Sequence, residues 1–352
     1  MPIVRLPDVV TFESRDIYEK HVHSHVIVKG VPAVPLLLSA ESCAKGIPLH
    51  DGPDYQYSIC TGLFYTDGST FNHTYLDFSP GTHGWERVEC YYRRRLPIVK
   101  MQVDYFFEHK KGRVGYRNFR IDEAPRRPEP DRRVVLLGDS NVITSYLAPK
   151  DRVDAMLGAA LAKTYPSLRV EVENAGRGGD AVKPFLETRR YERDLLTLGR
   201  IDVIFVCFGG NDRSRYDVKT FVAFQRRLLR RLREDFPGIR VVLETGVYVD
   251  YPRHFDRDRN REMKPYWDAV RSLADTADGV LDIWDVTRRE TKRGNWDLRY
   301  RQTPMGKLIL NRRFDRGHEN DPSWFSNIHH TPNANRIIAE AECEYIVKHR
   351  LL

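Results

Sequence analysis

Long apolar runs, a cysteine framework and any cofactor-binding signature are missing from this 352-residue chain. No apolar stretch reaches the roughly 20 residues of a membrane-spanning helix, so we expect no membrane segment. The five cysteines are irregularly spaced and include no CxxC pair, which argues against a disulfide scaffold and against a CxxC zinc site. The GKS or GKT ending of a P-loop is absent as well. We therefore expect a globular protein that needs neither a metal ion nor an organic cofactor.

The N-terminus also lacks the continuous apolar core of a secretory signal, because Arg5, Asp8 and Glu13 interrupt it. The expected location is the cytoplasm, or outside the cell if the numbering begins after a removed leader. The net charge of +8 is compatible with an acidic polymer as partner. Nucleic acid is not favoured, since there is no zinc finger, basic-region helix or RNP-type strand.

Residues 1–124 show the pattern of an antiparallel β-sandwich. Short alternating or aromatic runs are separated by turn pairs such as Asp67-Gly68 and Pro80-Gly81, with no good helix between them. A linker at 125–131, which contains three prolines, follows this part. The expected strands lie at 24–29, 33–38, 55–65, 71–78, 85–92, 98–107 and 113–121.

From residue 132 the pattern alternates between strand and helix, which predicts a flavodoxin-like, three-layer α/β/α domain with a parallel sheet over 132–352. The clearest helix is 217–236, where Phe221, Phe224, Leu228 and Leu232 form one stripe. Another helix is expected at 333–349. The predicted strands are short and rich in β-branched residues, as buried parallel strands are: 134–137, 168–172, 203–208, 240–243 and 280–283.

Four segments of this domain carry candidate chemistry at one edge of the sheet. Ser140 follows the first strand in Gly138-Asp139-Ser140, where it is either a nucleophile or a simple helix N-cap. Gly179 lies in a glycine-rich loop after the second strand, and Asn211 in Gly209-Gly-Asn-Asp212 after the third. His329 precedes the last helix. Acyl transfer needs this set: a hydroxyl, a base with a suitable pKa and several donors for an oxyanion.

These segments resemble, in order, the blocks of SGNH (GDSL-like) hydrolases: GDS, NxGxxGD, GGND and a C-terminal DxxH-like block. The resemblance covers about residues 132–350. It implies that Ser140 is the nucleophile and His329 the base. It also implies an oxyanion hole made of the backbone N–H groups of Ser140 and Gly179 and the amide of Asn211.

The chain departs from the family pattern three residues before the histidine, where Ser326 stands in place of an aspartate. In the family that carboxylate orients the imidazole. Here Ser326 or a backbone carbonyl orients His329, or Asp321 reaches in from the neighbouring loop, or the site is weak or inactive. An alternative reading makes His330 the base.

Other residues near these blocks are candidates for substrate contacts. The stretch 290–325 has no clear periodicity, and we expect it to wall the substrate site or to be disordered. The candidates are Asp139, Asn141, Arg177, Asp212, His330 and Trp324.

The N-terminal part resembles β-sandwich carbohydrate-binding modules in Thr61-Gly-Leu-Phe-Tyr-Thr-Asp-Gly68, in Gly81-Thr-His-Gly-Trp-Glu86 and in 112–122. Trp85, Tyr91 and Tyr92 either stack on sugar rings or fill the sandwich core. Together the two resemblances favour a serine esterase that removes O-acetyl groups from a carbohydrate through an acyl-enzyme. The alternatives are an inactive glycan-binding protein on this scaffold, and a lipase or thioesterase for longer acyl chains.

Overall fold

The structure is a computed structural model. None of the helices it describes is long and apolar enough to cross a membrane. Side chains are described except at 71–75, 299–302, 308–310 and 324–326. The described residues are 2–6, 9–16, 19–27, 30–48, 57–66, 68, 70–92, 97–108, 110–125, 128–144, 147, 149–249, 259–296, 298–302, 308–310, 324–326 and 328–352.

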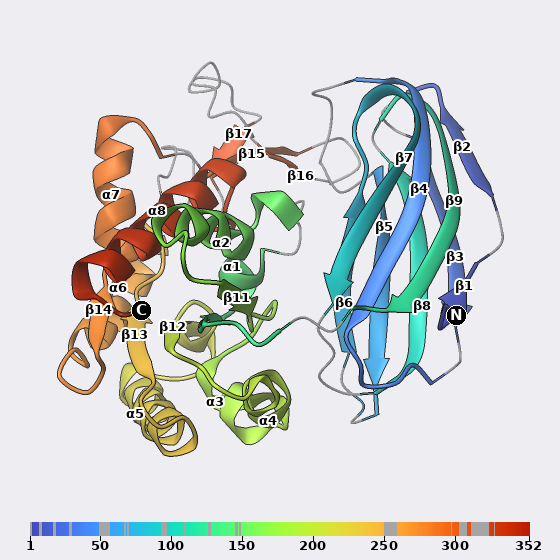
Figure 1. The fold of residues 1–352 in the computed structure, drawn as a ribbon. Coiled ribbons are helices and arrows are strands. Elements are labelled where there is room, and N and C mark those ends of the chain that lie inside the picture. The colour runs from blue at the N-terminus through green and yellow to red at the C-terminus, as the bar shows by residue number, and fades with distance from the viewer. Residues whose placement is uncertain are drawn as a thin grey trace. The chain divides into compact units, whose positions relative to one another are not determined.

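The chain forms two compact units, the first made mainly of residues 1–128 and the second mainly of residues 129–352. The first unit contains two antiparallel sheets, drawn in blue to green in Figure 1. One sheet has the order β1-β9-β4-β7, with β2 also paired to β9, and the other has the order β3-β8-β5-β6. The strands are β1 (Val4–Arg5), β2 (Val10–Ser14), β3 (Lys20–Ile27), β4 (Leu36–Ile47), β5 (Tyr57–Tyr65), β6 (Thr70–Asp77), β7 (Gly81–Tyr92), β8 (Ile98–Glu108) and β9 (Gly112–Glu123).

Alternate residues of these strands point into one shared aromatic and aliphatic core, as a sandwich requires. Tyr57, Phe107 and Tyr116 are among its fully buried members. The predicted β-sandwich is confirmed, although β1 and β2 were not foreseen. The strand expected at 33–38 is β4, which begins later and runs to Ile47.

Of the three aromatic residues considered for sugar stacking, Tyr92 packs against the core, whereas Trp85 does not belong to it. Trp85 is 43% exposed, and the Arg117 guanidinium lies 3.8 Å from its ring centroid. Tyr91 and Tyr92 are half-buried, and the Tyr92 hydroxyl is hydrogen-bonded to that of Tyr65. Core packing is therefore the wrong explanation for Trp85.

The second unit contains a five-stranded parallel sheet in the order β11-β10-β12-β13-β14 (Figure 1). In chain order this is 2-1-3-4-5, the flavodoxin-like arrangement. The predicted parallel sheet and α/β/α fold are confirmed, with strand ends shifted by up to two residues. The strands are β10 (Arg132–Gly138), β11 (Val170–Asn174), β12 (Val203–Cys207), β13 (Arg240–Glu244) and β14 (Gly279–Leu281).

Helices cover both faces of this sheet because its strands are apolar on both sides. Val135 and Leu137 face a core with α3, α4, α5 and α6, whereas Val134 and Leu136 face a core with α2, α7 and α8. The helices are α1 (Ser140–Ile143), α2 (Val153–Thr164), α3 (Val182–Glu187), α4 (Arg190–Asp194), α5 (Val218–Asp235), α6 (Arg259–Arg271), α7 (Ile283–Arg293) and α8 (Pro332–His349), with short 3-10 turns η2 (Pro149–Asp151), η3 (Leu196–Leu198) and η4 (Asp212–Ser214).

The stretch 290–325, expected to lack regular structure, contains more order than its sequence indicates. It begins with the end of α7 and includes parts of a small sheet in the order β16-β15-β17. Its strands are β15 (Arg299–Gln302), β16 (Leu308–Leu310) and β17 (Trp324–Ser326). Each is three or four residues long, too short to produce a visible alternation in sequence.

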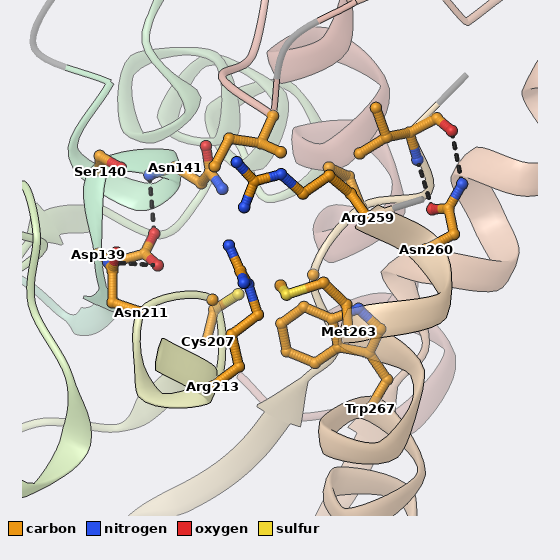
Figure 2. A pocket seen from close by; sticks show the side chains of 15 residues that line it. Asp139, Ser140, Asn141, Cys207, Asn211, Arg213, Arg259, Asn260, Met263 and Trp267 are labelled. Atoms are coloured by element: carbon orange, nitrogen blue, oxygen red, sulfur yellow. Dashed lines mark hydrogen bonds between the residues drawn. The ribbon is translucent and has the colours of Figure 1, made fainter. Parts of the chain in front are cut away.

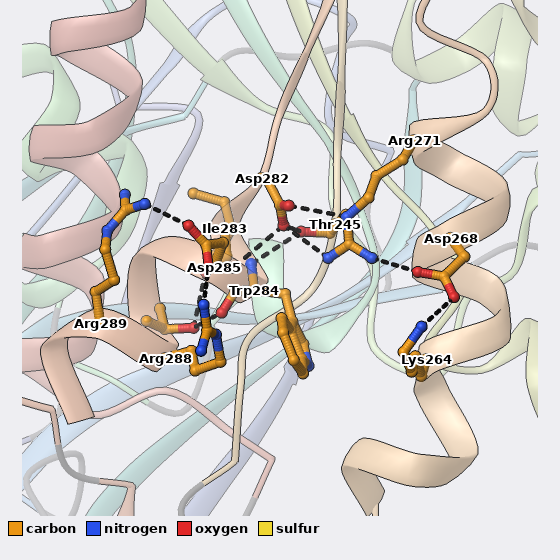
Figure 3. Close-up of polar contacts among 11 residues, drawn as sticks. Thr245, Lys264, Asp268, Arg271, Asp282, Ile283, Trp284, Asp285, Arg288 and Arg289 are labelled. Atoms are coloured by element: carbon orange, nitrogen blue, oxygen red, sulfur yellow. Dashed lines mark hydrogen bonds and ion pairs between the residues drawn. The ribbon is translucent and has the colours of Figure 1, made fainter. Parts of the chain in front are cut away.

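A polar network fixes the C-terminal end of α6 (Figure 3). Arg271, in the last turn of α6, donates from Nε to Asp282 Oδ2 at 2.8 Å, and Asp282 also caps the N-terminus of α7. Thr245, directly after β13, donates to the same carboxylate at 3.0 Å. The helix is therefore held against the sheet at one end, which positions the residues of its first turns.

Two buried carboxyl groups link β13 to α8. Glu244 ends β13 and is 5% exposed, and Glu342 of α8 is 2% exposed. Burial raises the pKa of both side chains, and for Glu342 the neighbouring Glu244 carboxylate raises it further. The folded protein therefore retains a proton that the unfolded chain releases above the ordinary glutamate pKa of 4.5.

When folding raises the pKa of a carboxyl group, the free energy of unfolding falls as the pH rises above the pKa that the group has in the unfolded chain. In Glu342→Gln a neutral amide replaces the carboxyl that must stay protonated, and it can donate to Glu244. We expect the Tm of this variant, relative to that of the wild type, to increase as the pH is raised from 5 to 8. The increase should be about 2–4 °C for each kcal/mol by which the wild type is destabilised by the retained proton.

The matched control is Glu340→Gln, on the same helix, where the carboxylate is exposed and pairs with Arg336. Its Tm difference from wild type should stay nearly constant over the same pH range. A Glu342→Gln Tm difference that is equally independent of pH would contradict the proposal that the folded protein retains this proton.

Candidate active site

The candidate residues gather at the carboxyl ends of β10 and β12, next to each other at the point where the strand order reverses. Open α/β sheets bind their ligands at such a switch point. Ser140 begins α1 directly after β10 and Asp139, and Asn211 lies between β12 and η4. The segment before α8 brings His329 to the same place.

Of the two histidines, His329 contacts the serine. Its Nε2 lies 3.2 Å from Ser140 Oγ, within hydrogen-bonding distance. Burial lowers the pKa of His329 below its ordinary value, so the imidazole is neutral at pH 7 and able to accept a proton.

His330 has a different environment, which argues against it as the base. It is buried, and its Nδ1 lies 3.1 Å from Asn335 Oδ1. The Asn335 amide in turn donates to Thr144 Oγ1 and to the carbonyl of Asp151. Burial lowers the pKa of His330 to about 3. These contacts join the first turn of α8 to the end of α1.

The Asp139 carboxylate connects Ser140's helix to Asn211. Its Oδ1 accepts the backbone N–H of Asn141 at 2.9 Å, and its Oδ2 accepts Asn211 Nδ2 at 3.1 Å (Figure 2). An asparagine amide has two hydrogens, so this bond fixes the amide plane and leaves the second N–H for another acceptor. Burial, followed by the nearby Asp212 and Asp180 carboxylates, raises the pKa of Asp139 to about 7.

Asp212, expected as a substrate contact, is instead fully buried. Its two carboxylate oxygens accept the backbone N–H groups of Val182 and Gly209, both at 3.0 Å. Burial raises its pKa to about 6 despite these bonds. The side chain therefore joins the loop after β11 to the loop after β12 and is not accessible to substrate.

Gly179 lies in the loop after β11, in the left-handed region at φ +73°. The loop is attached to β10 where the Arg177 N–H donates to the Gly138 carbonyl at 3.0 Å. Arg215 donates to the Gly179 carbonyl at 2.8 Å. The Arg177 side chain is exposed. These contacts hold the glycine loop beside the strand that carries Ser140.

At Gly209 and at Gly210 a different neighbour leaves no room for a side chain. A Cβ on Gly209 would lie 2.5 Å from the Trp267 ring, and one on Gly210 would lie 2.7 Å from Asp139 Oδ2. The chain could not pass so close to a tryptophan and a buried carboxylate with larger residues. Close packing therefore explains the motif before Asn211.

A pocket adjoins Ser140 and is lined by residues of several elements (Figure 2). Asn141, another expected contact, lines it, and the Asn141 Oδ1 atom is buried with no hydrogen bond to any described residue. Sequence reasoning missed the contribution of α6. The spacing of Arg259, Met263 and Trp267 at i, i+4 and i+8 is the signal that marks one helix face.

The residues proposed to orient His329 lie outside the described side chains. Ser326 is described by its backbone only, as the last residue of β17 paired with Arg299. Trp324 begins the same strand, and Asp321 lies outside the described residues. Their roles in orientation and substrate binding stay predictions.

The GDSL-like lipase/acylhydrolase family model matches residues 136–307. This part of the chain has the SGNH hydrolase fold, with its parallel sheet and helices. The match includes Ser140, Gly179 and Asn211 and ends before His329.

Several solved structures are similar to the chain, whereas no curated protein matches it by sequence. The acetylxylan esterase Axe2 from Geobacillus stearothermophilus is 19% identical, with 61% of this chain and 94% of that chain covered and a TM-score of 0.43. A lipase/acylhydrolase from Enterococcus faecalis is 19% identical, covering 61% and 95%, with a TM-score of 0.42. The Bacillus subtilis protein YxiM is 13% identical, covering 91% and 79%, with a TM-score of 0.47.

Gly210→Ala tests whether Asp139 positions Asn211. The added methyl group must displace the Asp139 carboxylate, which then releases the Asn211 amide. We expect the kcat for an aryl acetate to fall by about tenfold or more, as when an oxyanion donor is misplaced. Steady-state kinetics with thermal unfolding on the same samples measures this.

Gly158→Ala, within α2, is the control. A Cβ at Gly158 would have only Val172 Cγ2 nearby, at an ordinary contact distance of 3.7 Å. This control should leave kcat unchanged. If Gly210→Ala had the wild-type kcat and the wild-type Tm, this would contradict the idea that Asp139 positions Asn211.

Proposed function

We propose that the protein is a serine esterase that hydrolyses carboxylic esters through an acyl-enzyme intermediate. The observation that carries the proposal is the 3.2 Å contact between His329 Nε2 and Ser140 Oγ. A serine hydroxyl is a poor nucleophile until a base removes its proton, and a neutral imidazole at this distance is that base.

In the proposed reaction, His329 takes the proton of Ser140 as Oγ forms a bond to the ester carbonyl carbon. The carbonyl electron pair moves onto oxygen, where the N–H groups of Ser140 and Gly179 and the free amide N–H of Asn211 stabilise it. Collapse expels the alcohol, which receives the proton from His329. Water, deprotonated by His329, then attacks the acyl group and releases the acid and Ser140.

For the substrate we propose O-acetyl groups on a carbohydrate. The support is the sequence resemblance of the first unit to carbohydrate-binding modules, together with the exposed Trp85 on β7. Hydrolysis of acetylated oligosaccharides faster than of long-chain esters tests this choice against the lipase alternative. Glycan binding with no turnover of any ester would favour the inactive-scaffold alternative instead.

Ser140→Ala should reduce kcat/KM for 4-nitrophenyl acetate by about a thousandfold or more, because the nucleophile is removed. The protein should keep its Tm, since Ser140 is half-buried and small. Ser167→Ala, at an exposed turn before β11, is the matched control and should behave as wild type. Equal turnover by the Ser140 and Ser167 variants would refute the mechanism.

The pH profile tests the base. Because burial lowers the pKa of His329 below 6.5, kcat/KM should hold down to about pH 6.5 and then decrease as the imidazole is protonated, approaching tenfold per pH unit. Asp139 titrates near pH 7, so the profile is also measured in Asp139→Asn. The acid limb should persist in that variant; its loss would assign the limb to Asp139.

A further inference from the structure

Two arginines that no sequence motif marks enter the pocket beside Ser140. Arg213 belongs to η4, two residues after Asn211, and Arg259 is the first residue of α6. Figure 2 shows both guanidinium groups directed into the pocket, between Asn141 on one side and Met263 on the other. Two separate elements thus bring positive charge to one place.

Among the residues that the structure describes, this positive charge is only partly balanced. Glu262 Oε2 lies 2.9 Å from Arg213 Nη1 and 3.9 Å from Arg259 Nη1, so both guanidinium groups share one carboxylate oxygen. Asp139 is the one acid among the described pocket residues, and its carboxyl is bonded to Asn211 and Asn141 and has a pKa of about 7. Two guanidinium groups beside one ionised partner favour a singly charged anion.

The surroundings make this charge effective. The Arg213 and Arg259 side chains are 14% and 27% exposed, and the pocket floor is apolar. Electrostatic attraction is stronger in such a partly dehydrated site than in open water. A guanidinium group also matches a carboxylate in shape, through two parallel N–H···O bonds. The apolar floor is formed by Cys207, Val247, Met263 and Trp267.

We propose that this arginine pair is a carboxylate-binding subsite, so that the preferred ester substrate carries a carboxylate close to its scissile bond. The proposal rests on the proposed esterase function and names its substrate class. The carboxylate belongs either to the acyl group, as in a succinyl ester, or to the alcohol, as in an O-acetylated uronic acid. A long alkyl chain would instead remove water from two guanidinium groups that share a single carboxylate oxygen of Glu262.

Two matched pairs of substrates separate these sources. Phenyl hemisuccinate is compared with phenyl methyl succinate, and O-acetylated galacturonic acid with its methyl ester. The members of each pair differ by the carboxylate charge and by the methyl group that masks it. We expect the acid of one pair to have a kcat/KM at least about tenfold above that of its methyl ester, as for a charge-assisted hydrogen bond. Added salt should reduce the preference.

Arg259→Gln should bring that ratio close to one; because the acid and its methyl ester are measured with the same variant, a general change in activity cancels. Arg261→Gln removes the same charge from the same helix turn, but its side chain is exposed and does not line the pocket. This control should keep the wild-type ratio. A wild-type ratio near one in both pairs would overturn the proposal, as would equal effects of the two arginine variants.

Binding separates this proposal from the esterase mechanism. Titration calorimetry on Ser140→Ala measures the affinity for each acid and its methyl ester without turnover. Tighter binding of the acid, lost in Ser140→Ala/Arg259→Gln, supports the subsite even if the wild type hydrolyses nothing. Ser140-dependent hydrolysis of neutral esters with no preference for the acids would keep the esterase and reject the subsite.

Discussion

Two buried aspartate carboxylates hold the candidate active site together. Asp139 accepts the Asn141 N–H and the Asn211 amide, and Asp212 accepts the Val182 and Gly209 N–H groups. Together with the Arg177–Gly138 and Arg215–Gly179 bonds, they join the three loops that follow β10, β11 and β12. Burying a carboxyl group is unfavourable, as the raised pKa values of about 7 and 6 express. Several N–H donors on each group offset that cost.

This arrangement prepares the donors before any substrate binds. The Asn211 amide is fixed in its plane by Asp139, and the glycine loop is attached both to β10 and, through Asp212, to the next loop. Donors that need no reorganisation during the reaction stabilise a developing oxyanion best. The same carboxylates therefore connect the stability of the loops to the chemistry proposed for Ser140.

Close packing around Trp267 gives the pocket its floor. The indole ring occupies the space that a Cβ on Gly209 or Gly246 would need, so two strand ends approach the helix at backbone distance. The far end of α6 is fixed by the Arg271–Asp282 bond. As a result Arg259, at the opposite end of the helix, lines the same pocket as Ser140, where we propose that it influences which esters bind.

Much of the architecture and the four motif loops could be predicted from the sequence. The apolar runs and the helical stripe of 217–236 indicated a parallel sheet covered by helices. Strands that are buried on both faces consist mostly of apolar residues, and this can be recognised in a short stretch of sequence. The short strands β1, β2 and β15 escaped detection, since a few residues show no periodicity. Local sequence placed Ser140, Gly179 and Asn211 after strands and a histidine pair before the last helix.

Only the tertiary structure decided how those residues are used. In the sequence only the resemblance to a family block favoured His329 over His330, because adjacent side chains of the same type differ in function through the direction in which the backbone points them. It likewise offered Asp212 as a substrate contact, whereas folding buries that carboxylate between two loops. Arg213 and Arg259 are 46 positions apart in the chain, and their convergence depends on how α6 packs on the sheet. Short-range residue patterns predict the order of strands and loops. The burial, charge environment and contacts of a site depend on segments that come together only when the chain folds.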